Sequence, residues 1–188
     1  MVTLEQLWMP IIAAAVAVFA MSSLVHMVFK WHNSEYRKLP NEEEARAVLR
    51  SSAGSPGIYF VPHMSHYKEV KNPEVLRKFV DGPVAMITMR RAGTPGMGGA
   101  LGQWFVLNLV VAVIAGYLAC HAVPAGASFL AVARYVSVVT FMAYGVGAIS
   151  SGIWMGRPWS AVMKELLDAF IYALVSACVF AWLWPHAA

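Results

Sequence analysis

Charged side chains are scarce in this sequence. Asp, Glu, Lys and Arg make up 13% of its 188 residues and apolar residues make up 59%, whereas a soluble domain is usually about a quarter charged. This shortage excludes an ordinary soluble domain and favours an integral membrane protein. The net charge of +4 then serves membrane orientation, and we expect no nucleic-acid partner.

Cysteine is equally rare, since the chain contains only Cys120 and Cys178. Two cysteines exclude a disulfide framework and a four-cysteine metal site. A single disulfide between them is possible, because both fall in the outer half of the bilayer in the topology expected below. No sequence pattern supports that bond.

Four stretches lack charge, or nearly so, over a length that crosses a membrane, since about 20 helical residues span a hydrocarbon core of about 30 Å. Pro124 and Gly126 predict a hairpin between the second and third stretches. We therefore predict an all-α membrane fold, a four-transmembrane-helix bundle with a small cytoplasmic α/β insertion between helices 1 and 2. The expected parts are residues 1–29 (transmembrane helix 1), 30–99 (cytoplasmic α/β segment), 100–156 (transmembrane hairpin of helices 2 and 3) and 157–188 (cytoplasmic turn and transmembrane helix 4).

The polar segment contains signals for short elements. Asn41 and Asn72 are expected helix N-caps, and Gly82 is expected just past the end of the second helix. Residues 58–61 and 84–89 predict two short strands. Such a segment buries only a small core, so we expect the membrane or a partner to stabilise it.

The basic residues predict how the chain crosses the membrane. Eleven of the 14 lie in the polar segment, two lie in the loop before the fourth helix, and only Arg134 lies elsewhere. The positive-inside rule then places both loops in the cytoplasm and both termini outside. Trp182 and Trp184 are expected in the aromatic belt at the outer interface.

Four histidines, His26, His32, His63 and His66, fall on the expected cytoplasmic side. Neutral imidazoles are common metal ligands, so these four form a candidate metal or haem site. His26 is the strongest candidate, because it lies about one turn inside an apolar stretch. Their spacing matches no strong zinc or haem signature, and the alternative is that these are interfacial and surface histidines without a ligand.

Isolated charges near the apolar stretches predict ion pairs. A cation inside a span is costly, and Glu5 is the only carboxylate at the expected level of Arg134, so we predict an intramembrane Glu5–Arg134 pair. Asp168 lies about one turn into the fourth helix, where Arg157 or Lys164 is the expected partner.

Two further motifs predict contacts with lipid and with helices. Arg90 and Arg91 precede a glycine-rich entry to the second helix, which suits an anionic lipid headgroup; a plain flexible connection is the alternative. Small residues at four-residue spacing on the third helix predict close helix–helix contacts, within the bundle or with another subunit. They form two stripes: Ala143, Gly147 and Ser151, and Ala148, Gly152 and Gly156.

The first half of the chain contains several short motifs: Trp31-His32-Asn33, Leu39, Asn41-Glu42, Gly57-Ile58-Tyr59 with Pro62, and Gly82-Pro83. With them the chain resembles a family of small, uncharacterised, four-helix proteins of the bacterial inner membrane, although Lys30 stands where a proline is expected. The resemblance implies a multi-pass inner-membrane protein, whose termini would then be periplasmic. It implies no activity.

No nucleophile–base pair, paired-carboxylate site or complete cofactor motif is evident, which disfavours an enzyme. We predict a non-catalytic accessory or assembly subunit of a larger inner-membrane complex, in contact with lipid and with other subunits or copies of itself. The alternative is a metal- or haem-binding membrane enzyme or carrier that uses the four histidines. Of the two, we expect a protein without a cofactor more than one with a metal or haem. Transport is disfavoured, because no polar residue or broken helix is expected near the middle of a span.

Overall fold

A computed structural model describes residues 2–52 and 54–186 and shows two compact units. Within the described residues, the helical unit comprises 2–36 and 96–186, and the inserted unit comprises 37–95. The inserted unit thus occupies the middle of the segment predicted as an α/β insertion.

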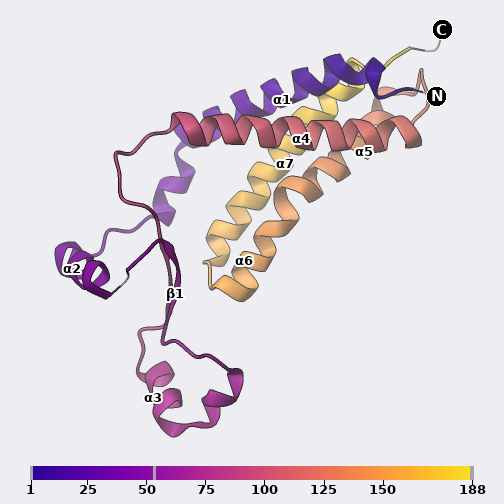
Figure 1. The fold of residues 1–188 in the computed structure, drawn as a ribbon. Coiled ribbons are helices and arrows are strands. Elements are labelled where there is room, and N and C mark those ends of the chain that lie inside the picture. Colours follow the sequence, from indigo (N-terminus) through magenta and orange to yellow (C-terminus); the bar gives the residue numbers. More distant parts are fainter. Residues whose placement is uncertain (1, 53, 187–188) are drawn as a thin grey trace. The chain divides into compact units, whose positions relative to one another are not determined.

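Four helices of the helical unit are long and apolar enough to cross a membrane: Glu5–Phe29, Gly98–Ala122, Phe129–Met155 and Trp159–Trp182 (Figure 1). The second and fourth are the continuous helices α4 (Gly98–Ala122) and α7 (Trp159–Trp182). The prediction of four long apolar helices is confirmed. Helix α7 begins directly after Pro158, so Lys164 and Glu165 lie within the helix and Asp168 lies more than two turns into it, further than the predicted single turn.

The first and third long helices each contain a π-helical segment. A 3-10 turn, η1 (Glu5–Leu7), leads into α1 (Trp8–Ser23), which continues as a π-helical segment, η2 (Leu24–Phe29). Helix α5 (Phe129–Phe141) is joined to α6 (Gly147–Met155) by a second π segment, η5 (Met142–Val146). The expectation that no polar residue lies near the middle of a span is wrong for Asn108, which lies in the central turns of α4 and is fully buried.

Gly126 lies in the turn between α4 and α5, where the sequence predicts it. Gly126 has φ of 71° in the loop between α4 and α5, and Ser128 caps α5 by accepting a hydrogen bond from the Ala131 N–H. Gly156, predicted within the third helix as part of a small-residue stripe, instead follows α6 in the left-handed conformation, with φ of 66°. Glycine is the usual residue at such a position, since it has no Cβ to clash.

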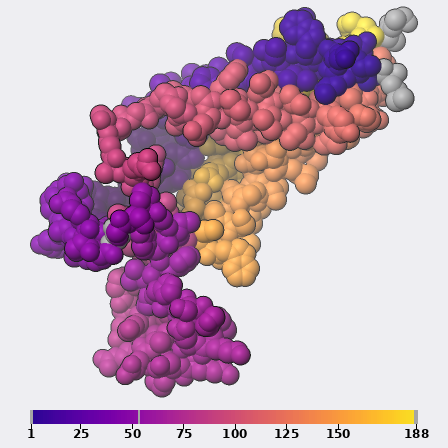
Figure 2. Space-filling view, viewed as in Figure 1, coloured from indigo at the N-terminus to yellow at the C-terminus, as the bar shows by residue number. Residues whose placement is uncertain are grey.

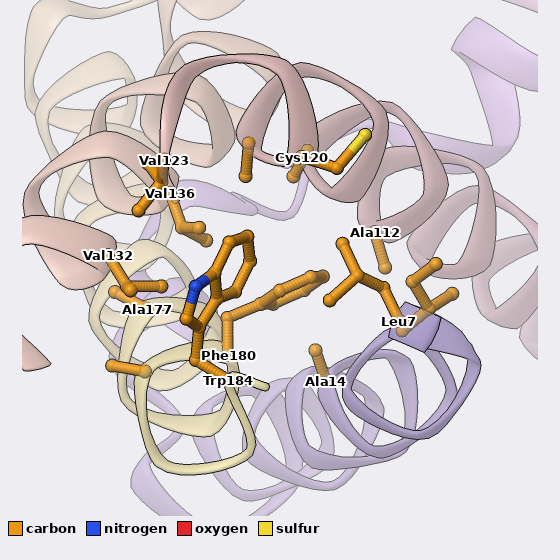
Figure 3. Close-up of a cluster of buried hydrophobic side chains, with 14 of the residues drawn as sticks. Leu7, Ala14, Ala112, Cys120, Val123, Val132, Val136, Ala177, Phe180 and Trp184 are labelled. Carbon is orange, nitrogen blue, oxygen red and sulfur yellow. The ribbon is translucent and has the colours of Figure 1, made fainter. Parts of the chain in front are cut away.

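Helix α5 packs along α7, and α1 packs against both α4 and α7. The surfaces of α1 and α4 lie against each other in Figure 2. The apolar core gathers around Phe180, which is fully buried among small side chains such as Ala14, Ala112 and Val136 (Figure 3). Small residues dominate this core, so the helices approach closely.

Trp184 also lies in this core, at 4% exposure. Its indole N–H donates to the Pro124 carbonyl at 2.9 Å, and the Gly126 N–H donates to the Pro185 carbonyl at 2.9 Å. The expectation of Trp184 in an exposed aromatic belt is wrong, because the loop between α4 and α5 supplies an internal partner for its indole. Trp182 is 82% exposed, as a belt residue would be.

The inserted unit contains α2 (Glu42–Ser52), β1 (Gly57–Val61), a 3-10 turn η4 (Tyr67–Lys71), α3 (Pro73–Asp81) and β2 (Ala85–Met89). The two strands pair antiparallel, with Tyr59 opposite Ile87. Asn72 caps α3 by accepting from the Glu74 N–H at 2.9 Å, and Gly82 follows it with φ of 63°. These helices and strands confirm the predicted elements. None of the described side chains of this unit is fully buried, in keeping with its small size.

Candidate metal centre

The π segment η2 positions His26, whose side chain is 52% exposed. Its Nδ1 lies 3.0 Å from the Ser22 carbonyl oxygen. Because a carbonyl only accepts, the ring hydrogen belongs on Nδ1, and Nε2 keeps its lone pair. His26 therefore presents an atom that can bind a metal ion.

Lys30 redirects the chain immediately after η2. It adopts the left-handed conformation, with φ of 53°, and starts a 3-10 turn, η3 (Trp31–Glu35). Lys164 of α7 holds this turn, since its Nζ donates to the Trp31 carbonyl at 2.6 Å and to the Ser34 hydroxyl at 2.7 Å. The turn thereby carries His32 against α7.

His32 is buried between two carboxylates. Its Nδ1 lies 2.7 Å from Glu35 Oε1, and its Nε2 lies 2.7 Å from Asp168 Oδ2. The His26 ring stacks on it, with centroids 4.7 Å apart and planes 3° from parallel, and His26 Nε2 lies 3.9 Å from the same Asp168 oxygen. Two imidazole nitrogens therefore converge on one carboxylate oxygen.

One ligand atom each from His26, His32 and Asp168 lies within 4.8 Å of the others. Two imidazoles with one carboxylate form a ligand set that suits Zn²⁺ or Fe²⁺. Glu35 stands behind His32 at Nδ1, where metal-binding histidines usually have a carboxylate or carbonyl partner that orients the ring. Ser22 plays that part for His26. Both rings are thus held with Nε2 toward the shared oxygen.

The charged side chains around the centre carry a net negative charge, which favours a bound cation. Arg157 bonds Glu165 at 2.7 Å, and Lys164 lies 3.7 Å from Glu35. The hydrogen bond to Glu165 raises the pKa of the Arg157 guanidinium, so this group stays charged. With neutral imidazoles, the carboxylates of Glu35, Glu165 and Asp168 outnumber these two cations by one. A bound cation would balance the remaining charge.

The second oxygen of Asp168, Oδ1, is buried and has no hydrogen-bond partner among the described residues. An unsatisfied buried polar atom is unfavourable. The expectation that Arg157 or Lys164 pairs with Asp168 is wrong, because η3 brings His32 to the carboxylate first, while Lys164 reaches toward η3 and Arg157 toward Glu165.

The structure brings together two of the four predicted histidines. His26 and His32 meet in the helical unit, whereas His63 and His66 belong to the inserted unit. His66 precedes η4, and its backbone N–H donates to Glu69 at 3.1 Å. The sequence missed Asp168 as a ligand, because 136 positions separate it from His32 and no local pattern joins them.

The other predicted sites are placed as follows. Among the described residues no ion pair joins Glu5 to Arg134, and both side chains are exposed. Arg90 and Arg91 are exposed in the inserted unit. Cys120 and Cys178 are both free, the first buried and the second exposed, so the disulfide left open by the sequence does not form.

The small residues of the third long helix have different surroundings. A Cβ added at Gly152 would lie 3.2 Å from Val162, so this glycine packs against α7. A Cβ added at Gly147 or Gly156 would meet nothing within 4 Å. Ala143 is exposed, and Ala148 and Ser151 are half-buried. The tightest contact belongs to Gly145, outside both stripes, where an added Cβ would lie 2.9 Å from Ala169.

Comparisons with protein-family models, with curated proteins and with solved structures find no match for this chain. Its function is therefore argued from the site. The resemblance to a family of small bacterial inner-membrane proteins stays a prediction.

Proposed function

We propose that this chain is an integral membrane protein that holds one divalent first-row transition metal ion between His26, His32 and Asp168. The observation that carries the proposal is the convergence of both Nε2 atoms on Asp168 Oδ2, at 2.7 and 3.9 Å. A hydrogen-bonded acceptor behind each ring supports it, because such partners orient metal-binding histidines.

The membrane setting rests on four long apolar helices and on the distribution of basic residues. We place the protein in the bacterial inner membrane, with both termini periplasmic and the inserted unit cytoplasmic. His26 and His32 lie at the end of the first span, so the metal centre would face the cytoplasmic boundary of the bilayer.

Three protein ligands leave coordination positions open. A tetrahedral ion keeps one and an octahedral ion keeps three, which is typical of sites that bind a further ligand and not of closed structural sites. The bound ion supplies Lewis acidity to a ligand in such a position. Haem fits less well, because two stacked rings that approach the same oxygen do not face each other across an iron atom.

The test uses the full chain in detergent micelles, stripped with a chelator and titrated with Co²⁺ and Zn²⁺. We expect one Co²⁺ per chain, a visible spectrum of nitrogen–oxygen coordination, and competition by Zn²⁺. The variants His26→Ala, His32→Ala and Asp168→Asn each lose at least tenfold in affinity. Glu35→Gln loses about 10–100-fold, as second-layer partners commonly do.

The matched control is the double variant with His63→Ala and His66→Ala, which removes the two predicted histidines of the inserted unit. It should bind Co²⁺ like the unaltered protein. Equal loss in this control and in His26→Ala would place the ion elsewhere. Stoichiometric binding that survives Asp168→Asn and His32→Ala in folded protein, checked by circular dichroism, would overturn the proposal.

The role of a non-catalytic accessory subunit, with other membrane subunits or further copies as partners, stays a prediction. Native mass measurement of the protein extracted in mild detergent tests it. A defined complex would support it, and a lone monomer would count against it.

A further inference from the structure

The two strands of the inserted unit form a ribbon, and one face of this ribbon exposes large apolar side chains. Successive side chains of a strand point to opposite faces, and residues opposite each other on paired strands share a face. Ile58 lies opposite Thr88, and Phe60 lies opposite Met86. These four residues therefore share one face, the Phe60 face. On it, Ile58 is 59% exposed and Phe60 is 52% exposed.

The Phe60 face is too small to hold a protein partner by itself. Each strand has five residues, which at about 3.4 Å per residue gives a length of about 17 Å. The face of two such strands, about 4.8 Å apart, covers less than about 200 Å². A stable protein interface usually buries about 800 Å² on each partner. The face is thus better suited to a surface beside which the chain already holds it.

Two arginines stand at one end of the ribbon. Arg90 and Arg91 directly follow Met89, the last residue of β2. Both are exposed, and neither forms an ion pair with a described residue. In the same unit, Arg46 of α2 bonds Glu43 at 2.7 Å. The guanidinium groups at the end of the ribbon are therefore available to an anion from outside the unit.

The inserted unit carries the whole net charge of the protein. Residues 37–95 contain ten Lys and Arg and six Asp and Glu, a balance of +4 that equals the net charge of the full chain. The helical unit therefore has a balance of zero. Anionic phospholipids give the cytoplasmic leaflet of a membrane a negative surface potential, which attracts basic segments beside a span. The charge of the inserted unit is complementary to that surface.

The chain tethers this end of the ribbon to the second long helix. Arg90 precedes Gly98, the first residue of α4, by eight positions. A chain of that length reaches at most about 29 Å, and this covalent limit holds for every arrangement of the two units. Binding between tethered partners is effectively intramolecular, so contacts that would be weak between separate molecules suffice.

We propose that the Phe60 face, together with Arg90 and Arg91, binds the surface of an anionic phospholipid bilayer. Ile58 and Phe60 enter the boundary between headgroups and acyl chains, and the two arginines bind the phosphate groups. The bilayer then covers apolar side chains that so small a unit cannot bury by itself. This surface goes beyond the metal centre, and it rests on the membrane setting proposed above.

The test uses the full chain in nanodiscs. The variant Ile58→Cys carries a fluorescent label, in a background with Cys120→Ala and Cys178→Ala. Phospholipids with a nitroxide on the headgroup quench a label that reaches the bilayer surface. Quenching should be at least threefold stronger in equal parts of phosphatidylglycerol and phosphatidylcholine than in phosphatidylcholine alone. The matched control is a label on Val80→Cys, 76% exposed on α3, whose quenching should not depend on the lipid.

Two results at position 58 overturn the proposal. The first is quenching that is absent, or that is equal in the two lipid compositions. The second is protection of the label from a water-soluble quencher without quenching by the lipid, which would mean that protein covers the Phe60 face.

Charge variants assign the contact to the end of the ribbon. Arg90→Gln with Arg91→Gln should lower the quenching at position 58 at least twofold in nanodiscs that contain phosphatidylglycerol. Arg46→Gln with Arg50→Gln removes the same charge from α2 and is the matched control, with a smaller expected effect. Equal losses in the two double variants would mean that only net charge matters, and would overturn the role of the ribbon.

A further variant tests the apolar part of the contact. Phe60→Thr removes the exposed ring and keeps a residue type that favours strands, and should lower the quenching at least twofold. Unchanged quenching in this variant would overturn the insertion of the Phe60 face. Added salt should also weaken the quenching, because it screens the attraction between the arginines and the lipid.

A label on the native Cys178 reads the membrane setting separately. This cysteine is exposed on α7, and a nitroxide on the acyl chains should quench its label in both lipid compositions. Quenching at Cys178 without quenching at position 58 would show that the spans hold and that the surface contact fails. Absent quenching at Cys178 would overturn the membrane setting, and the surface contact with it.

Discussion

The two ends of the helical unit bury different kinds of side chain. At the end that contains Trp184, all members of the buried cluster around Phe180 are apolar. At the other end, His32, Asn108 and Asp168 are buried. The four buried side-chain atoms without a partner among the described residues, on Trp31, Asn108, Asp168 and Tyr172, all belong to this polar end.

The apolar end stabilises the fold, whereas the polar end carries the proposed site. Each unpartnered buried polar group costs about 1–3 kcal/mol, so the polar end is not arranged for greatest stability. Both π segments, η2 and η5, contribute residues to it, namely His26 and Tyr144. Such segments are frequent at functional sites. The apolar end supplies the stability that holds these costly groups in place.

The largest expected effect concerns the apolar end. Phe180→Ala removes a fully buried ring, and should lower the free energy of unfolding by about 3–5 kcal/mol, because it leaves a cavity among small residues. Phe170→Ala on the same helix, where Phe170 is 52% exposed, is the control and should change little. Unfolding in detergent followed by circular dichroism measures both, and equal losses would remove the distinction between the ends.

At the polar end, His32→Ala in metal-free protein should destabilise the fold by about 3 kcal/mol. The reason is that Asp168 stays buried without its partner, and breaking a buried pair from one side is costly. A double variant with leucine at both positions 32 and 168 should recover most of the loss, since apolar pairs often replace buried ion pairs without cost. A double variant as unstable as His32→Ala would show that this end contributes to stability after all.

Gly145→Ala tests the packing of η5 against α7. The new Cβ would lie 2.9 Å from Ala169 of α7, and overpacking of this kind usually costs about 1–3 kcal/mol. Gly147→Ala, two residues away and with open space around it, should instead stabilise the helix by about 0.5–1 kcal/mol. A destabilised Gly147→Ala that also loses a native oligomer would support the predicted subunit contact at that stripe.

The smallest effect is expected at Lys30, which ends η2 with φ of 53°. Lys30→Gly relieves a left-handed strain of about 1–2 kcal/mol and loses about 0.4–1 kcal/mol through a more flexible unfolded chain. The net result should be a gain of about 0.5–1 kcal/mol, measured by the same unfolding experiment. Lys30→Ala keeps the strained backbone and should show no gain, and an equal gain in both variants would point to the side chain instead.

The sequence predicts the regular parts of this molecule well, because their signals are local. Pro124 and Gly126 mark the turn between α4 and α5, and Asn72 and Gly82 mark the ends of α3. These positions carry the residue types that caps and tight turns require.

The site was only half predictable, since its geometry depends on irregular backbone. The position of His26 and His32 at the end of an apolar stretch predicts them as candidate ligands. Their partnership with Asp168 has no local signal, because it requires Lys30 in a conformation that glycine usually takes and a π segment that begins without a proline. The available signal is a carboxylate inside an apolar helix, and its partner is His32 from across the bundle and not a nearby cation.

The apolar cluster joins Val2 to Trp184, which are nearly the first and last described residues of the chain. Contacts between such distant positions are slow to form, since a long loop must close first. Helix α1 packs against both α4 and α7. During synthesis α4 therefore covers one part of the buried face of α1, and the rest stays uncovered until α7 arrives.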